Sequence, residues 1–183
     1  MRKIIMILLV IAMFLPLVAE KIGGVILPDK LTLGEEDLIL NGGGVRKKVI
    51  IKVYSSALYL PAKNSNVANI LDAQTAISVR MHFIYKEVDQ AKLIEAWNEG
   101  FVNGGFQNQF AVEIAKFNKM FNAPAKKGDV YDIAYLPAKG LQVIKNGIEV
   151  GTIKSPGFRK AVFSIWLGEN SALPKLKKAM LGK

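Results

Sequence analysis

The chain of 183 residues contains no cysteine and only one histidine, His82. The absence of cysteine excludes disulfides, thiolate metal sites, a lipid-modified cysteine and a cysteine nucleophile. One histidine is too few for a zinc site with the usual ligand spacing, and no nucleophile elbow lies near His82 to complete a Ser-His-Asp triad. The sequence also lacks a Gly-x-x-x-x-Gly-Lys loop, and its glycine cluster does not open a helix as a dinucleotide fingerprint must. We therefore predict no metal and no cofactor, and assign no catalytic residue.

The N-terminus has the layout of a secretory signal. Arg2 and Lys3 precede an apolar stretch from Ile4 to Val18, and Pro16 would break a helix just before the small residue Ala19. We predict a signal peptide at residues 1–19, a single domain at residues 20–183, and export, with the periplasm as the destination. The alternative is an uncleaved anchor, because the apolar stretch is close to the roughly 17 to 25 residues that span a bilayer. After cleavage we expect no stable membrane insertion.

Basic residues outnumber acidic ones. Removing Arg2 and Lys3 from the 25 basic residues leaves 23 against 15 acidic ones, a formal charge of +8. The lysines come as scattered small pairs rather than as one stripe, and the chain carries an export signal. We therefore expect no nucleic-acid partner, and interpret the charge as favouring solubility with a mild attraction for anions.

The order of predicted elements indicates an α+β fold. The predicted strands are Asp37 to Asn41 and Val45 to Leu60, joined at the glycines, then Thr75 to Phe83, Val130 to Leu136, Gly140 to Lys145 and Ile148 to Lys154. The predicted helices are Asn66 to Ala73, Gln90 to Asn103, Gln107 to Phe121, Phe158 to Leu167 and Leu173 to Leu181. Strands and helices grouped in this way cannot form regular βαβ crossovers. The sequence therefore predicts a mostly antiparallel, open-faced sheet layered with helices.

Three local patterns support these assignments. Hydrophobic residues alternate along the strand from Thr75, so that Ser78, Arg80 and His82 should lie on a polar face. Asp89 is a favourable N-cap for the helix that follows it. The Asn146-Gly147 pair between two strands predicts a tight hairpin.

Residues 41–61, NGGGVRKKVIIKVYSSALYLP, are the most informative segment. Glycines permit unusual backbone angles and close approach of neighbouring chain, so Gly42 to Gly44 mark either a tight bend or a place where a ligand reaches the backbone. The simplest interpretation is a hairpin corner that leaves Arg46 solvated. The alternative is a binding site, because a guanidinium offers a planar fork of donors that fits a carboxylate or enolate, and the Tyr54 phenol adds another donor.

This segment resembles the signature of the chalcone isomerase-like family. The matching residues are Gly42, Gly44, Arg46, Ile51, Lys52, Val53, Tyr54, Leu58 and Tyr59. A second similarity, to the tail of compact bacterial members, covers Phe163 to Gly168 and Leu176 to Gly182. The resemblance implies the chalcone isomerase fold, with a ligand cleft between the sheet and the helices.

The resemblance also suggests two uses of Arg46. In catalytic plant members the matching arginine stabilises an enolate during an intramolecular Michael addition, whereas in fatty-acid-binding members an arginine and a strand tyrosine hold a carboxylate. Tyr54 matches the tyrosine of the binders, where the enzymes have a threonine. The resemblance therefore favours a non-catalytic binder of a fatty acid or similar amphipathic anion, with Arg46 and Tyr54 as ligand-binding residues. Aromatic residues of the two central helices, including Trp97, Phe101, Phe106, Phe110 and Phe117, would line the cleft or pack in the core.

Two other functions stay open. One is an intramolecular lyase acting on a chalcone-like phenolic ligand, in which Arg46 stabilises the enolate. The other is a cell-envelope interaction protein that docks through Lys175, Lys177 and Lys178. Whether the protein is an enzyme, its ligand and its oligomeric state are not determined by the sequence.

A shared site makes a geometric demand. Arg46 and Tyr54 are eight residues apart, which in one unbroken strand would separate them by ~26 Å. We therefore predict that the segment from Gly42 to Lys48 folds back as a turn or bulge and brings the two side chains to within roughly 3 to 6 Å.

Overall fold

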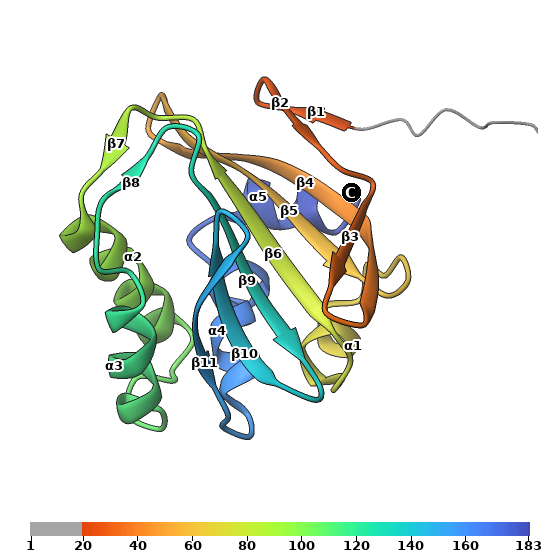
Figure 1. Ribbon diagram of the computed structural model, residues 1–183, viewed down its shortest axis with the longest axis vertical. Coiled ribbons are helices and arrows are strands. Elements are labelled where there is room, and N and C mark those ends of the chain that lie inside the picture. Colours follow the sequence, from red (N-terminus) through yellow and green to blue (C-terminus); the bar gives the residue numbers. More distant parts are fainter. Residues whose placement is uncertain (1–19) are drawn as a thin grey trace, which may run out of the picture.

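The computed structural model describes residues 20–183, and the predicted signal peptide at residues 1–19 lies outside them (Figure 1). The described chain forms a seven-stranded sheet in the order β11-β10-β9-β6-β5-β4-β3, in which all neighbours are antiparallel. Its strands are β3 (Lys30–Leu33), β4 (Glu36–Lys48), β5 (Ile51–Leu60), β6 (Ile77–Phe83), β9 (Val130–Leu136), β10 (Gly140–Lys145) and β11 (Ile148–Ile153). Two short ribbons, β1 (Glu20–Ile22) with β2 (Val25–Leu27) and β7 (Glu87–Val88) with β8 (Ala125–Lys126), lie outside it.

The helices of the described chain build one hydrophobic core with the sheet. They are α1 (Val67–Asp72), α2 (Gln90–Asn103), α3 (Ala111–Lys119), α4 (Phe158–Leu167) and α5 (Pro174–Met180). In Figure 1, α4 and α5 lie behind the sheet, and α2 and α3 stand to its left. Helix α4 is buried along most of its length and packs against α1 and α2, while α5 packs on β4. This arrangement confirms the predicted α+β, antiparallel architecture.

The opposite face of the sheet is partly polar. On β6, Val79, Met81 and Phe83 join the core beneath the helices, while Arg80 and His82 lie half-buried on the other face. The predicted alternation is therefore confirmed, although Ser78 is fully buried instead of facing water. A second, smaller hydrophobic cluster lies where β1 to β4 cover the neighbouring strands.

The prediction that two strands meet at the glycines was wrong. Strand β4 runs without a break through Gly42, Gly43 and Gly44, and the chain reverses at the two-residue turn of Val49 and Ile50. The glycines instead allow helix α5 to lie close to the backbone of β4. A Cβ at Gly42 would overlap the carbonyl oxygen of Ala179 in α5, so only glycine lets this helix lie directly on the strand.

Elements defined by local patterns agree with the sequence. Helices α2 and α4 have the predicted bounds, and strands β9 and β10 do as well. Asn146 and Gly147 form a tight turn in which both residues have positive φ, as their pairing predicts. Asp89 occupies the N-cap position of α2, but its side chain makes no capping hydrogen bond there. The sequence analysis missed the short strands β1 to β3, β7 and β8, whose partners stabilise them more than their own composition does.

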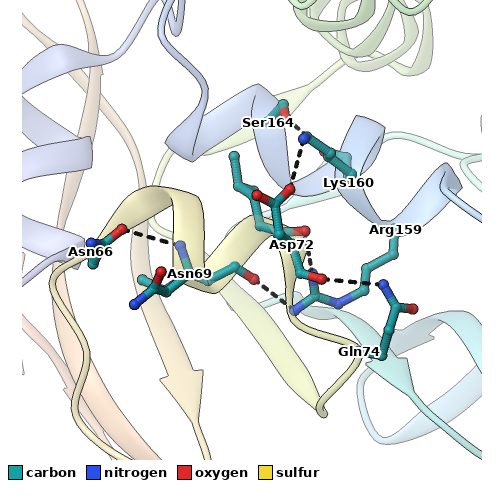
Figure 2. A network of polar contacts seen from close by, with 9 residues as sticks. Asn66, Asn69, Asp72, Gln74, Arg159, Lys160 and Ser164 are labelled. Carbon is teal, nitrogen blue, oxygen red and sulfur yellow. Dashed lines mark hydrogen bonds and ion pairs between the residues drawn. The ribbon is translucent and has the colours of Figure 1, made fainter.

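One buried arginine that the sequence analysis did not single out joins α1 to α4. Arg159 on α4 is 3% exposed and donates to the carbonyl oxygens of Ile70 and Leu71, both at 2.9 Å (Figure 2). These carbonyls lie at the C-terminal end of α1, where a helix leaves its acceptors without partners. Next to it, Lys160 makes an exposed ion pair with Asp72 at 2.7 Å. Arg159 therefore has a structural role.

No helix within residues 20–183 is long and apolar enough to cross a membrane.

Candidate ligand-binding site

Arg46 and Tyr54, the two predicted site residues, lie opposite each other on the neighbouring strands β4 and β5. The guanidinium carbon of Arg46 lies over the Tyr54 ring, 5.7 Å from its centroid. The turn at Val49 and Ile50 brings them together, and the strand register shifts between Arg46 and Lys47. The two side chains thus meet as the shared-site hypothesis requires. The reversal lies just beyond the predicted segment of Gly42 to Lys48, which itself contains only the register shift.

The guanidinium of Arg46 has no carboxylate partner in the part of the chain that the structure describes. The two other described arginines are both engaged. Arg80 makes two hydrogen bonds to Asp132, at 2.7 and 2.8 Å, and Arg159 binds the end of α1. A half-buried guanidinium without an internal anion keeps its fork of donors available for a ligand. Among the three described arginines, Arg46 is the one whose guanidinium is available in this way.

Tyr54 is almost completely buried, with 4% of its surface exposed. Its hydroxyl oxygen accepts a hydrogen bond from the indole Nε1 of Trp166 at 3.3 Å, and its ring packs on Phe83. Burial raises the pKa of the Tyr54 phenol, and this outweighs the opposing effects of the Arg46 charge and the Trp166 hydrogen bond. The phenol therefore keeps its proton at neutral pH and can donate it to an acceptor.

A small cavity of about 60 Å³ lies against this pair. Its walls come mainly from β5, α2, α4 and the segment between α4 and α5, and include Leu93, Trp97, Ile165 and Leu173. The indole N–H of Trp97 is buried and has no hydrogen-bond partner among residues 20–183. The cavity therefore combines largely apolar walls with two cations, Arg46 and Lys92, with one carboxylate, Glu99, and with uncommitted donors. The excess of cations over carboxylates and the apolar walls suit the head group of an amphipathic anion.

The other aromatic residues that the sequence assigned to the two central helices do not line this cavity, and Phe106 and Phe110 lie between α2 and α3 rather than within them. Phe101, Phe106, Phe110 and Phe117 pack in the hydrophobic core or against it, as the core-packing alternative predicted. Sequence reasoning also missed Trp166, although it belongs to the C-terminal stretch that carries the family resemblance. Its contact with Tyr54 joins residues far apart in the chain, which no local pattern reveals.

Two open grooves share Arg46, Ala172 and Leu173 with the cavity. One, of about 690 Å³, runs between β4 and the start of α5. The other, of about 470 Å³, runs between the β4–β5 hairpin and α2. Both volumes fall in the range of roughly 300 to 1,000 Å³ that is typical of small-molecule sites, whereas the cavity itself is smaller. Arg46 therefore lies where the small cavity meets more open space.

His82 lies apart from this site. It is half-buried on the other face of β6, and burial together with the charge of Arg80 lowers its pKa. Within the described residues there is no group of three or more His, Cys, Asp or Glu side chains placed to hold a metal ion.

The fold and the site define a class of protein in which helices cover one face of an antiparallel sheet and a small cavity with a few polar groups lies between them. The family model described as chalcone isomerase-like matches residues 19–182, so the chain belongs to the chalcone isomerase-like family. A comparison with curated protein sequences found no match. Among solved structures, the fold is similar to a fatty-acid binding protein of Arabidopsis thaliana, with a TM-score of 0.71 and 16% sequence identity. That alignment covers 86% of this chain and 92% of the Arabidopsis chain.

Proposed function

We propose that this protein is an exported, non-catalytic binder of a fatty acid or a similar amphipathic anion. The observation that carries the proposal is the half-buried guanidinium of Arg46, which has no carboxylate partner among residues 20–183 and lies beside the protonated phenol of Tyr54. Two donors of this kind, one of them permanently charged, bind a carboxylate more favourably than a neutral head group. The similarity to a fatty-acid binding protein supports the same ligand class.

The volumes of the cavity and the grooves indicate that the head group and the tail of the ligand bind in different places. A cavity of about 60 Å³ accommodates a head group and little more. An alkyl tail therefore has to lie in one of the grooves that share Arg46, where side chains such as Leu173 and Val49 offer apolar contacts. Each methylene removed from water contributes about 0.8 kcal/mol, so the tail would supply most of the affinity and Arg46 the orientation.

Export is the second part of the proposal. It rests on the signal-like sequence of residues 1–19, and the periplasm is the proposed destination. Comparing the N-terminal residue of the purified protein with Glu20 tests it directly, because cleavage after Ala19 predicts that residue as the new terminus.

Neither alternative function gains support from a particular contact. A lyase needs a group that accepts or relays a proton, and the raised pKa of Tyr54 makes this phenol a poor base at neutral pH. Docking through three lysines of α5 requires them to be free, but the Lys177 ammonium donates to the carbonyl oxygen of Gly168 at 2.8 Å.

Native mass spectrometry of the protein purified from its own host tests the binding proposal. We expect a bound acid, or uptake of acids from a panel running from dodecanoic to octadecanoic acid, with weaker uptake of the matching alcohols at the same concentrations, because an alcohol keeps the tail contacts but loses the charged head group. A protein that carries no acid and takes up none from the panel would refute the proposal. An absorbance assay with naringenin chalcone, measured against the uncatalysed cyclisation, tests the lyase alternative.

A further inference from the structure

The tip of the β4–β5 hairpin exposes two large apolar side chains. Val49 and Ile50 are 90% and 88% exposed, the highest values for large hydrophobic residues in the described chain. Ile51 and Tyr85, next to the tip along the groove toward α2, are 44% and 42% exposed. Isolated exposed hydrophobic residues are common, but a contiguous apolar tip on a projecting hairpin indicates a surface that contacts something.

The backbone of this turn is unfavourable for the residues it contains. Val49 has φ of 58°, in the left-handed region that β-branched residues avoid. A two-residue hairpin with positive φ at its first position favours glycine there, followed by a polar residue. Selection for folding stability alone would therefore favour other residues than Val49 and Ile50 at this turn. Strain that folding does not explain is a reason to look for a function.

The chemistry around the tip identifies the partner. Lys47, Lys48 and Lys52 flank it and are exposed, and residues 46–54 contain no acidic side chain. Three acidic residues, Glu87, Glu95 and Glu99, line the groove that runs from the tip toward α2. An apolar point surrounded by lysines fits the headgroup region of an anionic bilayer, where apolar side chains enter the acyl boundary and cations meet phosphates. A protein partner would normally need a broader surface, about 800 Å² on each side.

We propose that the β4–β5 tip docks the protein peripherally on an anionic lipid surface. Val49 lines both grooves that share Arg46, so docking places the entrance to the candidate site at the bilayer. In that orientation a fatty acid passes between the membrane and the groove without crossing water. This second step depends on the proposed function, whereas the docking itself does not.

The experiment uses the absence of native cysteine, because a single introduced cysteine labels one position only. Ile50→Cys places an environment-sensitive nitrobenzoxadiazole probe at the tip, and Ile148→Cys places it at the start of β11, where Ile148 is 73% exposed. Vesicles consist of phosphatidylcholine with or without phosphatidylglycerol. We expect blue-shifted, brighter emission from position 50 with the anionic vesicles only, reversed by high salt, and no change at position 148. The local probe reports on the tip even if residues 1–19 also bind lipid.

Two variants separate the apolar and ionic contributions. The double variant Val49→Gly, Ile50→Ser suits the turn better, so it should fold at least as stably and bind anionic vesicles roughly 10-fold or more weakly. Changing Lys47, Lys48 and Lys52 to glutamine should weaken binding on the order of 100-fold at low salt. A probe at position 50 that stays in water, or a double variant that binds as the wild type does, would overturn the proposal.

The docking proposal and the proposed function fail in different ways. Ile50 lines none of the grooves that share Arg46, so the single variant Ile50→Ser should bind fatty acid in solution like the wild type while binding anionic vesicles more weakly. Weaker vesicle binding with retained acid uptake supports docking. If the wild type fails to take up fatty acid but its tip enters anionic vesicles, the docking proposal is supported and the proposed fatty-acid ligand is refuted.

Discussion

Arg46 and Tyr54 face each other across the two strands of one hairpin, with the guanidinium carbon 5.7 Å from the centre of the phenol ring. Arg46 lines the small cavity and both grooves, and Tyr54 lines the cavity. The Tyr54 hydroxyl oxygen accepts a hydrogen bond from the indole of Trp166. Arg46, in contrast, has no carboxylate partner among the described residues. A fixed phenol beside an uncommitted cation is the feature on which the binding hypothesis depends.

Replacing Arg46 should weaken the binding of carboxylates but not of alcohols. Hydrogen bonds to charged groups contribute about 1.5 to 3 kcal/mol, so Arg46→Ala should lower the affinity for dodecanoic acid roughly 10- to 100-fold. Titration calorimetry with dodecanoic acid and dodecanol separates the head group from the tail. Lys119→Ala removes an exposed positive charge from α3 and serves as the control. Equal losses in the two variants would show that Arg46 acts only through net charge.

Arg46→Ala should also leave the fold nearly intact. Since the guanidinium makes no ion pair within residues 20–183, its main contact is with the Tyr54 ring, which is worth about 0.5 to 1 kcal/mol. Urea denaturation measures this cost. A loss of several kcal/mol would assign Arg46 a structural role instead of a binding role.

Tyr54 should make stability fall at high pH. The folded protein raises the pKa of this phenol above its unfolded value of about 10, so the stabilisation is fully present below pH ~10 and is lost as the pH rises toward the folded pKa. Urea denaturation at several pH values on both sides of this point tests the expectation. Tyr54→Phe should show a shallower decline above pH ~10, and a baseline cost of about 1 kcal/mol from the lost Trp166 hydrogen bond. Identical slopes would contradict the assignment.

The glycines of β4 should differ in their tolerance of alanine. At Gly42 an added methyl group meets backbone atoms of α5, including the Ala179 carbonyl oxygen, which cannot move independently. At Gly44 it meets the side chains of Ala179 and Leu176, at 3.0 and 3.1 Å. Gly42→Ala should therefore cost about 2 to 3 kcal/mol and Gly44→Ala about 1 kcal/mol or less, measured by chemical denaturation. The reverse order would mean that α5 does not lie on β4 as described.

Arg159 and Lys160 provide a matched pair of neighbouring cations. Arg159→Met leaves the carbonyl groups of Ile70 and Leu71 buried without donors, and we expect a loss of about 3 kcal/mol. Lys160→Met removes only an exposed ion pair with Asp72 and should cost less than about 1 kcal/mol. Thermal and urea unfolding of both variants compare the two costs. Similar losses would show that Arg159 does not hold the end of α1.

The features predicted correctly depend on neighbouring residues in the chain. The bounds of α2, the alternation of Val79, Met81 and Phe83 on β6, and the turn at Asn146 and Gly147 follow from periodicity and turn chemistry. The antiparallel α+β architecture follows from the order of these elements. The resemblance of residues 42–59 directed attention to Arg46 and Tyr54, whose role in binding stays a prediction.

The features that the sequence could not provide depend on contacts between distant residues. A run of three glycines is compatible with a bend or with close packing, and only the position of α5 against β4 decided for packing. The reversal at Val49 and Ile50, a pair with no turn preference, is imposed by the pairing of β4 with β5. The freedom of Arg46, the support of Tyr54 by Trp166 and the burial of Arg159 likewise arise when the chain packs. Periodicity and turn preference are local properties, whereas partners and cavities exist only once segments far apart in the sequence are brought together.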